Sequence, residues 1–86
     1  METAIETMHS LNVKIMATHA SQARDSLDLD LIQTVMLEAR GYWLGLLTAN
    51  APPALVSDAY QAYSRAKENE AVIRFERDSS VDGWIP

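Results

Sequence analysis

Apolar and polar residues follow one another along most of this chain at the three- and four-residue spacing of amphipathic helices. The pattern is interrupted at residues 25–28 and 50–53, where Asp, Ser, Asn and Pro favour turns and helix caps. We therefore predict an all-α fold, a small elongated bundle in which residues 1–86 form a single domain. The predicted elements are three main helices over residues 3–24, 29–49 and 53–76 and a short irregular C-terminal tail over 77–86.

The first predicted helix has an apolar face that two polar residues interrupt. At 100° per residue the face fills an arc of roughly 140°. It is made by Ala4, Ile5, Met8, Leu11, Ile15, Met16 and Ala23. Asn12 and His19 fall inside this arc, seven residues apart. A polar residue on a helix seam lowers stability but fixes the register or the number of partners. Alternatively, both residues lie at the edge of the face or donate to a backbone carbonyl.

The second predicted helix is the most apolar element, and we expect it to form the core. Its stripe consists of Leu29, Ile32, Val35, Met36, Ala39, Tyr42, Trp43, Leu46 and Leu47. The opposite face holds Gly41 and Gly45, and each glycine inside a helix costs about 1 kcal/mol relative to alanine. We therefore predict close packing of another helix against these two glycines, as in small-residue helix contacts. The alternatives are that Gly41 ends or kinks the helix, or that both glycines are merely tolerated.

The third predicted helix has an apolar face that weakens towards its C-terminal end. The face is made by Leu55, Val56, Ala59, Tyr60, Ala62, Tyr63 and Ala66. Beyond Ala66, charged residues enter this face, among them Glu70, which is spaced to pair with Lys67 and Arg74. We expect the helix to leave the bundle here and to present a separate apolar patch over residues 72–75.

Aromatic residues supply the candidate partner-binding positions, because aromatic side chains dominate the energy of many protein interfaces. The predicted partner-binding residues are Tyr42, Trp43, Tyr60, Tyr63, Trp84 and Ile85. Several of them have a competing role in filling the core. The last two lie in the tail, which we expect to dock on its own chain, on a partner or on a second copy.

Length and composition point to a partner chain. A domain of 86 residues buries only about 60–65% of the surface of its unfolded chain. The sequence has no Cys, which excludes disulfides, thiolate zinc sites and thiol nucleophiles. We therefore predict a homodimer or an obligate complex with another protein, held by the flanks of the second helix and by the tail.

The charge excludes other classes of partner. With 12 acidic and 7 basic residues the net charge is −5, so nucleic acid and anionic membrane surfaces are repelled. The longest uncharged run, residues 41–57, is too short and too rich in Pro for membrane insertion. Glu2 and Glu6 precede the first basic residue, so no signal peptide is expected and the predicted location is cytoplasmic.

Candidate chemistry is sparse, and we predict no catalytic residue, metal site or cofactor. Glu6 and His9 match the Glu-x-x-His pair of di-metal helical bundles, but the pair occurs once where those sites need several. The run Asp25-Ser26-Leu27 resembles the Asp-Ser-Leu site of acyl carrier proteins. That resemblance implies a phosphopantetheine arm on Ser26, whereas local physics favours Ser26 or Asp28 as a helix cap.

A second resemblance concerns secretion systems. Residues 53–56 and 59–63, Pro-Ala-Leu-Val and Ala-Tyr-Gln-Ala-Tyr, look like the turn and second helix of type III secretion needle subunits. This resemblance implies a structural subunit of an assembly.

Taken together, the residues favour a small acidic, non-enzymatic protein-binding regulator. An inhibitor, anti-activator or adaptor of the kind that phages and bacteria encode fits this description. Such a regulator acts through an apolar helix face and the tail around Trp84. The alternatives are a structural subunit or chaperone of a secretion or other multiprotein assembly and, more remotely, an acyl-carrier-like protein that uses Ser26.

Overall fold

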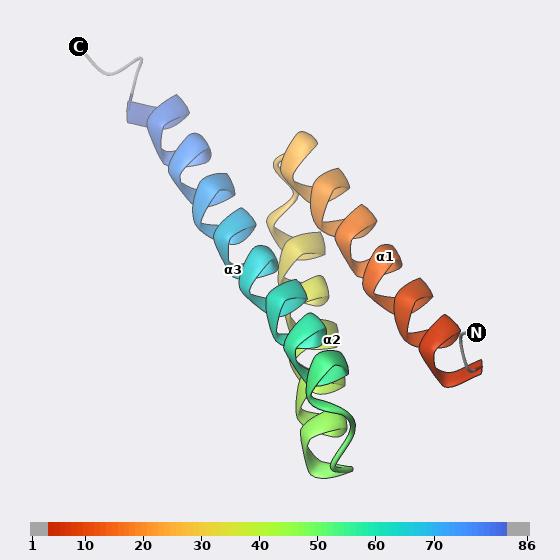
Figure 1. The fold of residues 1–86 in the computed structure, drawn as a ribbon. Coiled ribbons are helices and arrows are strands. Elements are labelled where there is room, and N and C mark those ends of the chain that lie inside the picture. Colours follow the sequence, from red (N-terminus) through yellow and green to blue (C-terminus); the bar gives the residue numbers. More distant parts are fainter. Residues whose placement is uncertain (1–3, 83–86) are drawn as a thin grey trace.

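The computed structural model describes residues 4–82, with side chains for residues 4–78, and this part of the chain folds into three α-helices without a strand. The helices are α1 (Ala4–Asp25), α2 (Leu29–Thr48) and α3 (Pro53–Asp82). α1 and α3 run in the same direction and α2 runs antiparallel to both (Figure 1). The predicted all-α bundle of three main helices is confirmed.

The first turn ends α1 and caps α2 within four residues. Leu27 adopts the left-handed conformation that terminates many helices, with φ of 51°. Asp28 is the N-cap of α2, because its Oδ1 accepts a hydrogen bond of 3.0 Å from the backbone N–H of Leu31. Ser26 does not cap α2, since its hydroxyl donates back to the Gln22 carbonyl at 2.7 Å. The structure therefore selects Asp28 from the two predicted caps.

The second turn is built in the same way, at the position that the sequence predicts. Asn50 adopts φ of 56° after the end of α2, and the N–H of Ala51 donates to the Leu46 carbonyl at 3.0 Å. Together with the bond from the Asn50 N–H to the Leu47 carbonyl, this closes a Schellman motif. α3 then begins at Pro53, whose missing N–H has no role in a first helical turn.

All three helices contribute to one core, and α2 supplies its centre as expected. Ile32, Val35 and Ala39 of α2 are at most 1% exposed. The buried residues of this core are Met16, Ala20, Ala23, Ile32, Val35, Ala39, Ala66 and Ile73. Four of these eight residues are alanines, and Ile32, Val35 and Ile73 are the largest side chains that are fully buried.

The expectation that α3 leaves the bundle after Ala66 was wrong. Ala66 and Ile73 are seven residues apart on one face of the helix, and both are fully buried in the core. The charged residues of this region lie beside that face. Arg74 Nε pairs with Glu70 Oε1 at 3.7 Å, as the spacing predicts. Of the expected apolar patch, Phe75 remains strongly exposed.

The third helix is also longer than predicted. α3 continues to Asp82, so an irregular tail from residue 77 was wrong over residues 77–82. No Gly or Pro occurs between Ala54 and Asp82, and the turn-forming Ser and Asp residues near the end do not stop the helix alone. The predicted tail contacts of Trp84 and Ile85 lie outside the described residues.

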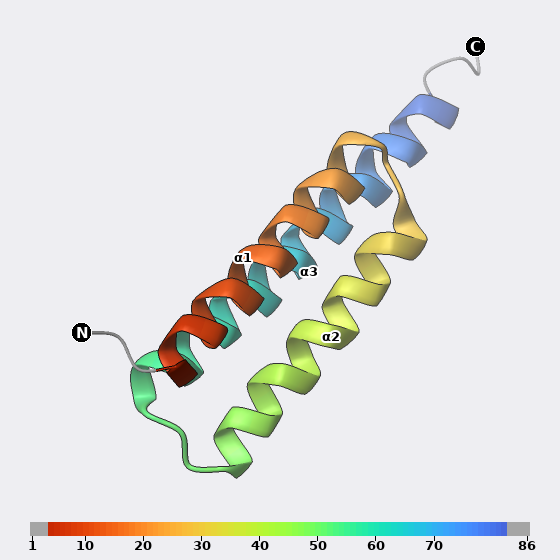
Figure 2. The ribbon, with the colours of Figure 1, turned by 90° about the vertical axis from the view of Figure 1, so that its right-hand side faces the viewer.

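The bundle is long and thin. Its radius of gyration is 15.4 Å and its extents are 59 × 21 × 16 Å, whereas a compact domain of this length has a radius of gyration of about 12 Å. The predicted elongated shape is confirmed. Figure 2 shows the end of α3 projecting past the turn between α1 and α2. A bundle of this shape leaves much of each helix uncovered, and the uncovered faces carry the candidate functional surfaces.

Candidate functional site

Three of the predicted partner-binding aromatics form one cluster between α2 and α3. The Trp43 ring lies 5.1 Å from the Tyr60 ring and 6.0 Å from the Tyr63 ring, measured between centroids. The Trp43 and Tyr63 planes are nearly parallel, 11° apart, and the Trp43 and Tyr60 planes are tilted by 60°. These are the offset and tilted arrangements that aromatic rings prefer. We call Trp43, Tyr60 and Tyr63 the aromatic cluster.

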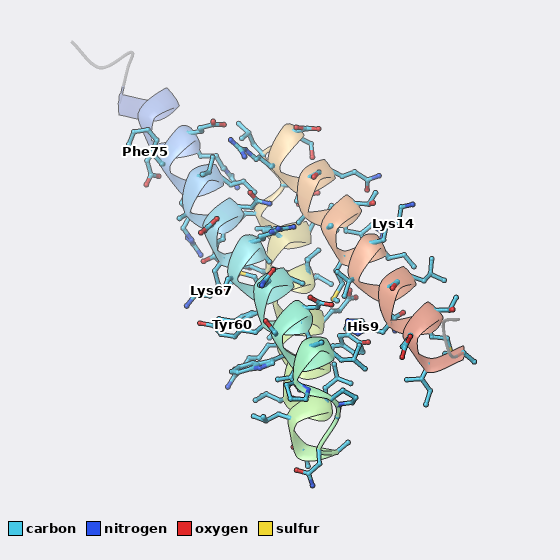
Figure 3. The ribbon with its side chains drawn as sticks, viewed as in Figure 1. His9, Lys14, Tyr60, Lys67 and Phe75 are labelled. Carbon is cyan, nitrogen blue, oxygen red and sulfur yellow. The ribbon has the colours of Figure 1, made fainter. Side chains whose placement is uncertain are left out.

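A basic side chain extends the aromatic cluster along α3. The ammonium of Lys67 lies 5.5 Å from the centroid of the Tyr63 ring, within the range of a cation–π contact. Figure 3 shows Tyr60 and Lys67 on the same side of α3. Tyr60 is 48% exposed, so about half of its surface is available to a partner.

The aromatic cluster borders a groove of about 440 Å³ at the turn between α2 and α3. Most of its lining is apolar, and Asn50 and Ser57 are its non-aromatic polar side chains. The groove, which we call the aromatic groove, is lined by Trp43, Leu47, Asn50, Ala51, Pro53, Val56, Ser57 and Tyr60. Its position follows from the fold, because the turn at residues 50–53 brings the last turn of α2 against the first turns of α3.

The fourth predicted aromatic, Tyr42, belongs to a different cluster. Its hydroxyl lies 2.5 Å from Nδ1 of His9, and the two rings stack with centroids 5.6 Å apart. Nε2 of His9 lies 3.4 Å from Oδ2 of Asp58, which is largely exposed. The contacts are satisfied when Tyr42 donates to Nδ1 and Nε2–H donates to Asp58. His9, Tyr42 and Asp58 therefore join α1, α2 and α3, and we call them the His9 cluster.

The His9 cluster favours a structural role over a catalytic one. A general base needs a nitrogen that reaches the substrate, whereas both ring nitrogens of His9 already have protein partners. The imidazole is only 4% exposed and, as Figure 3 shows, is directed from α1 towards the neighbouring helices. Sequence reasoning noted His9 only beside Glu6 and missed its place in the core. The signal was present in the helical spacing of His9, Met16, Ala20 and Ala23.

α1 presents its larger aliphatic side chains to solvent. The exposed fractions are 71% for Ile5, 64% for Met8, 56% for Leu11 and 43% for Ile15. These four residues, the α1 stripe, share one face of the helix, while the core receives the face that holds His9, Met16, Ala20 and Ala23. The apolar arc predicted for this helix is thus divided, and its bulkier part is uncovered.

The two glycines of α2 have no close neighbour within the described part of the chain. A Cβ atom added at Gly41 or Gly45 would meet nothing within 4 Å. No helix of the same chain packs closely against them, and α2 neither ends nor breaks at Gly41. Close packing against this face by a second chain stays a prediction.

Ser26, the candidate attachment residue, lies exposed in the first turn. Its hydroxyl is bonded to the end of α1 rather than placed at the start of α2. Within residues 4–82 no group of three or more His, Asp or Glu side chains is arranged to hold a metal ion.

Comparisons with known proteins do not bear on the role of these surfaces. No family model, curated protein or solved structure matches the chain. Among the described residues, no helix combines the length and the apolar character needed to cross a membrane.

Proposed function

We propose that this protein is a small non-enzymatic regulator or adaptor that binds a larger protein through the aromatic groove. The observation that carries the proposal is the gathering of Trp43, Tyr60 and Tyr63 beside an apolar groove, with Tyr60 half exposed. Trp and Tyr are enriched among the residues that dominate binding energy. The cytoplasmic location expected from the sequence stays a prediction.

The arrangement of the rings supports recognition of a partner. In the single chain the Trp43 ring already contacts both Tyr60 and Tyr63. Rigid aromatic side chains lose little conformational entropy on binding and offer a large contact area. A partner segment with one or two apolar side chains would fill the space between Leu47, Val56 and Tyr60.

The lining favours a protein segment over a small polar ligand. Sites for small molecules combine an apolar wall with several polar groups that fix the orientation of the ligand. In the aromatic groove, the non-aromatic polar side chains are Asn50 at the turn and Ser57 near the start of α3, and both are exposed. The backbone N–H of Asn50 is already bonded to the Leu47 carbonyl.

The test is affinity purification of the tagged chain from its native host, comparing Tyr60→Ala with Phe75→Ala. Both residues are exposed aromatics of α3, but Phe75 lies fifteen residues further along the helix and outside the groove. We expect Tyr60→Ala to lose a protein that the wild type and Phe75→Ala retain. Equal capture by both variants, with helicity unchanged by circular dichroism, would contradict the proposal.

The predicted contribution of the tail is tested separately. A chain truncated after Asp82 lacks Trp84 and Ile85, the other two candidate anchors. We expect truncation to weaken partner capture and to leave the helicity of residues 4–82 unchanged. Unchanged capture would remove the tail from the proposed interface.

Two alternatives from the sequence have their own discriminating results. A secretion or assembly subunit would form filaments or require a co-expressed partner for stability. An acyl-carrier-like protein would gain the mass of phosphopantetheine at Ser26 when co-expressed with a transferase. We rank both below the regulator, because neither accounts for the aromatic cluster.

A further inference from the structure

We propose that the α1 stripe is a self-association surface, on which two copies of this chain pair their α1 helices in parallel and in register. This surface is separate from the aromatic groove, which lies between α2 and α3. The inference therefore does not rest on the proposed function. It also differs from the expectation that the flanks of α2 hold a dimer.

The spacing along the exposed face of α1 is that of a coiled-coil seam. Ile5, Met8, Asn12, Ile15 and His19 alternate at three and four residues, as the a and d positions of a heptad do. None of them is buried in the single chain. Leu11 flanks this seam and would widen the contact. Among the residues that the structure describes, this short heptad-like row is thus left uncovered by the fold of one chain.

The position of Asn12 favours a second copy of this chain as the partner of the α1 stripe. Its exposed amide sits at the middle a position, between Met8 and Ile15. Against an apolar helix from an unrelated protein, the buried amide would lose its hydrogen bonds to water. Against the same residue of a second copy, each amide donates to the other. A single Asn at an a position is known to fix parallel register in this way. An antiparallel pairing would place Asn12 opposite an apolar residue instead.

The charge distribution agrees with a second copy as the occupant. α1 contains two acidic residues, Glu6 and Asp25, and two basic residues, Lys14 and Arg24, so its formal net charge is zero. The net charge of −5 for the whole chain therefore arises outside α1. None of the four residues lies in the seam. Two copies that meet along α1 thus bring together the region with the least electrostatic repulsion.

The small area of the α1 stripe indicates a weak dimer. The exposed portions of the α1 stripe amount to a few hundred Å² per copy, the size at which an apolar patch is often functional. A stable interface usually buries about 800 Å² per partner. Because α1 is already folded on the bundle, pairing does not have to form the helix. We therefore expect a reversible dimer with Kd on the order of 1–100 μM.

The first experiment is sedimentation equilibrium of the full chain from about 1 to 500 μM. The wild type is expected to shift from monomer to dimer over this range. Met8→Glu places two glutamates against each other and should raise Kd by about 100-fold. Leu37→Glu is the matched control on exposed α2 and should leave Kd unchanged. Circular dichroism verifies that both variants remain helical.

A second variant tests the role of Asn12 itself. Asn12→Leu should tighten association and replace the single dimer by a mixture that includes larger oligomers, because the polar pair no longer restricts them. If Asn12 lies outside the interface, the mass distribution of this variant equals that of the wild type. That result would overturn the proposed register.

Cross-linking tests the orientation. The chain has no Cys, so Ile5→Cys introduces a single thiol at an a position. Parallel, in-register helices bring the two thiols together, and oxidation should give a covalent dimer. Ser21→Cys, exposed but outside the seam, should not cross-link. Dimerisation without cross-linking at position 5 would overturn the parallel arrangement.

Two results overturn the proposal as a whole. One is a wild type that stays monomeric at 500 μM. The other is a dimer that Leu37→Glu dissociates and Met8→Glu does not, which would place the interface on α2. Tyr60→Ala, which tests the proposed function, is expected to dimerise as the wild type does, so the two proposals fail independently.

Discussion

The α1 stripe and the aromatic cluster are both apolar and both partly exposed, yet their side chains are arranged in different ways. The α1 stripe is a row of aliphatic side chains along the exposed face of one helix, and Asn12 lies among them. The aromatic cluster consists of rings that hold one another in place beside a groove, with Lys67 over one of them. The row of the α1 stripe suits the proposed pairing with the same row of a second copy. The aromatic groove suits the proposed binding of a partner segment of complementary shape.

The difference shows that exposure alone does not define a binding site. Leu37 is as exposed as the residues of the α1 stripe, but the charged Arg40 separates it from Leu44, the next exposed leucine of α2. What distinguishes the two surfaces is the spacing of neighbouring residues in one case and ring contacts in the other. The following substitutions separate the surfaces from the core that supports them.

The largest effect is expected for Ile32→Ala, which should destroy both surfaces together. Ile32 is fully buried in the core shared by α1, α2 and α3. Truncation of a buried Ile to Ala lowers the free energy of unfolding by about 2–5 kcal/mol. Urea unfolding followed by circular dichroism measures the loss, with exposed Leu37→Ala as the control, expected to change by less than about 0.5 kcal/mol. Equal losses for the two variants would contradict the assigned core.

The next effect, at His9, should distinguish the two surfaces. His9→Ala leaves the Tyr42 hydroxyl without its partner and frees the N-terminal half of α1, at a cost of about 1–3 kcal/mol. The α1 stripe should lose the packing of α1 on the bundle that His9 provides, whereas the aromatic groove should keep the ring contacts between α2 and α3.

A double-mutant cycle separates the hydrogen bond from packing. The combined variant with His9→Leu and Tyr42→Phe removes both polar groups and should cost less than the sum of its single substitutions. Additive losses in urea unfolding would show that the His9–Tyr42 contact does not contribute.

A smaller and general effect is expected at Asp28. Its carboxylate caps α2, and Asp28→Ala should lower the free energy of unfolding by about 1 kcal/mol. Neither surface should change, since the cap lies at the turn between α1 and α2. Thermal unfolding measures the loss, and Asp25→Ala, a neighbouring acid without the capping bond, serves as the control. A loss of the same size at both positions would argue against the cap.

The smallest effect is a gain, and it tests the predicted packing of the glycines. A Cβ at Gly41 or Gly45 has open space, so replacement of either by Ala should stabilise the isolated chain by up to about 1 kcal/mol. Self-association through the α1 stripe should be unaffected. If either substitution instead abolishes the dimer or the capture of a partner, a second chain packs against this face of α2.

The fold was predictable because its signals are local. The turns at Asp28 and Asn50 follow from capping and turn chemistry, and the stripe of α2 follows from helical spacing. The end of α3 was not predicted, because Ser79 and Ser80 resemble a turn, although nothing in that segment stops a helix.

The surfaces were only partly predictable, because the sequence of α1 carries two competing faces. One face has the larger side chains, including Ile5, Met8 and Ile15, and the other has Met16, Ala20 and Ala23. Helical spacing does not decide which face the bundle buries. The bundle buries the face that holds Met16, Ala20 and Ala23. His9 lies in the core as well, where Tyr42 and Asp58 contact it from two other helices. Tyr42 and Trp43 are adjacent in sequence and therefore serve different clusters.

A dilution series of the ¹⁵N-labelled chain, followed by heteronuclear NMR, locates the self-association residue by residue. We predict concentration-dependent shifts at the amides of residues 5–19, strongest around Asn12, with the Trp43 indole and the Tyr60 amide unchanged. Shifts concentrated at the Trp43 indole, or along the exposed face of α2 while residues 5–19 stay constant, would contradict the assignment of separate roles to the α1 stripe and the aromatic cluster.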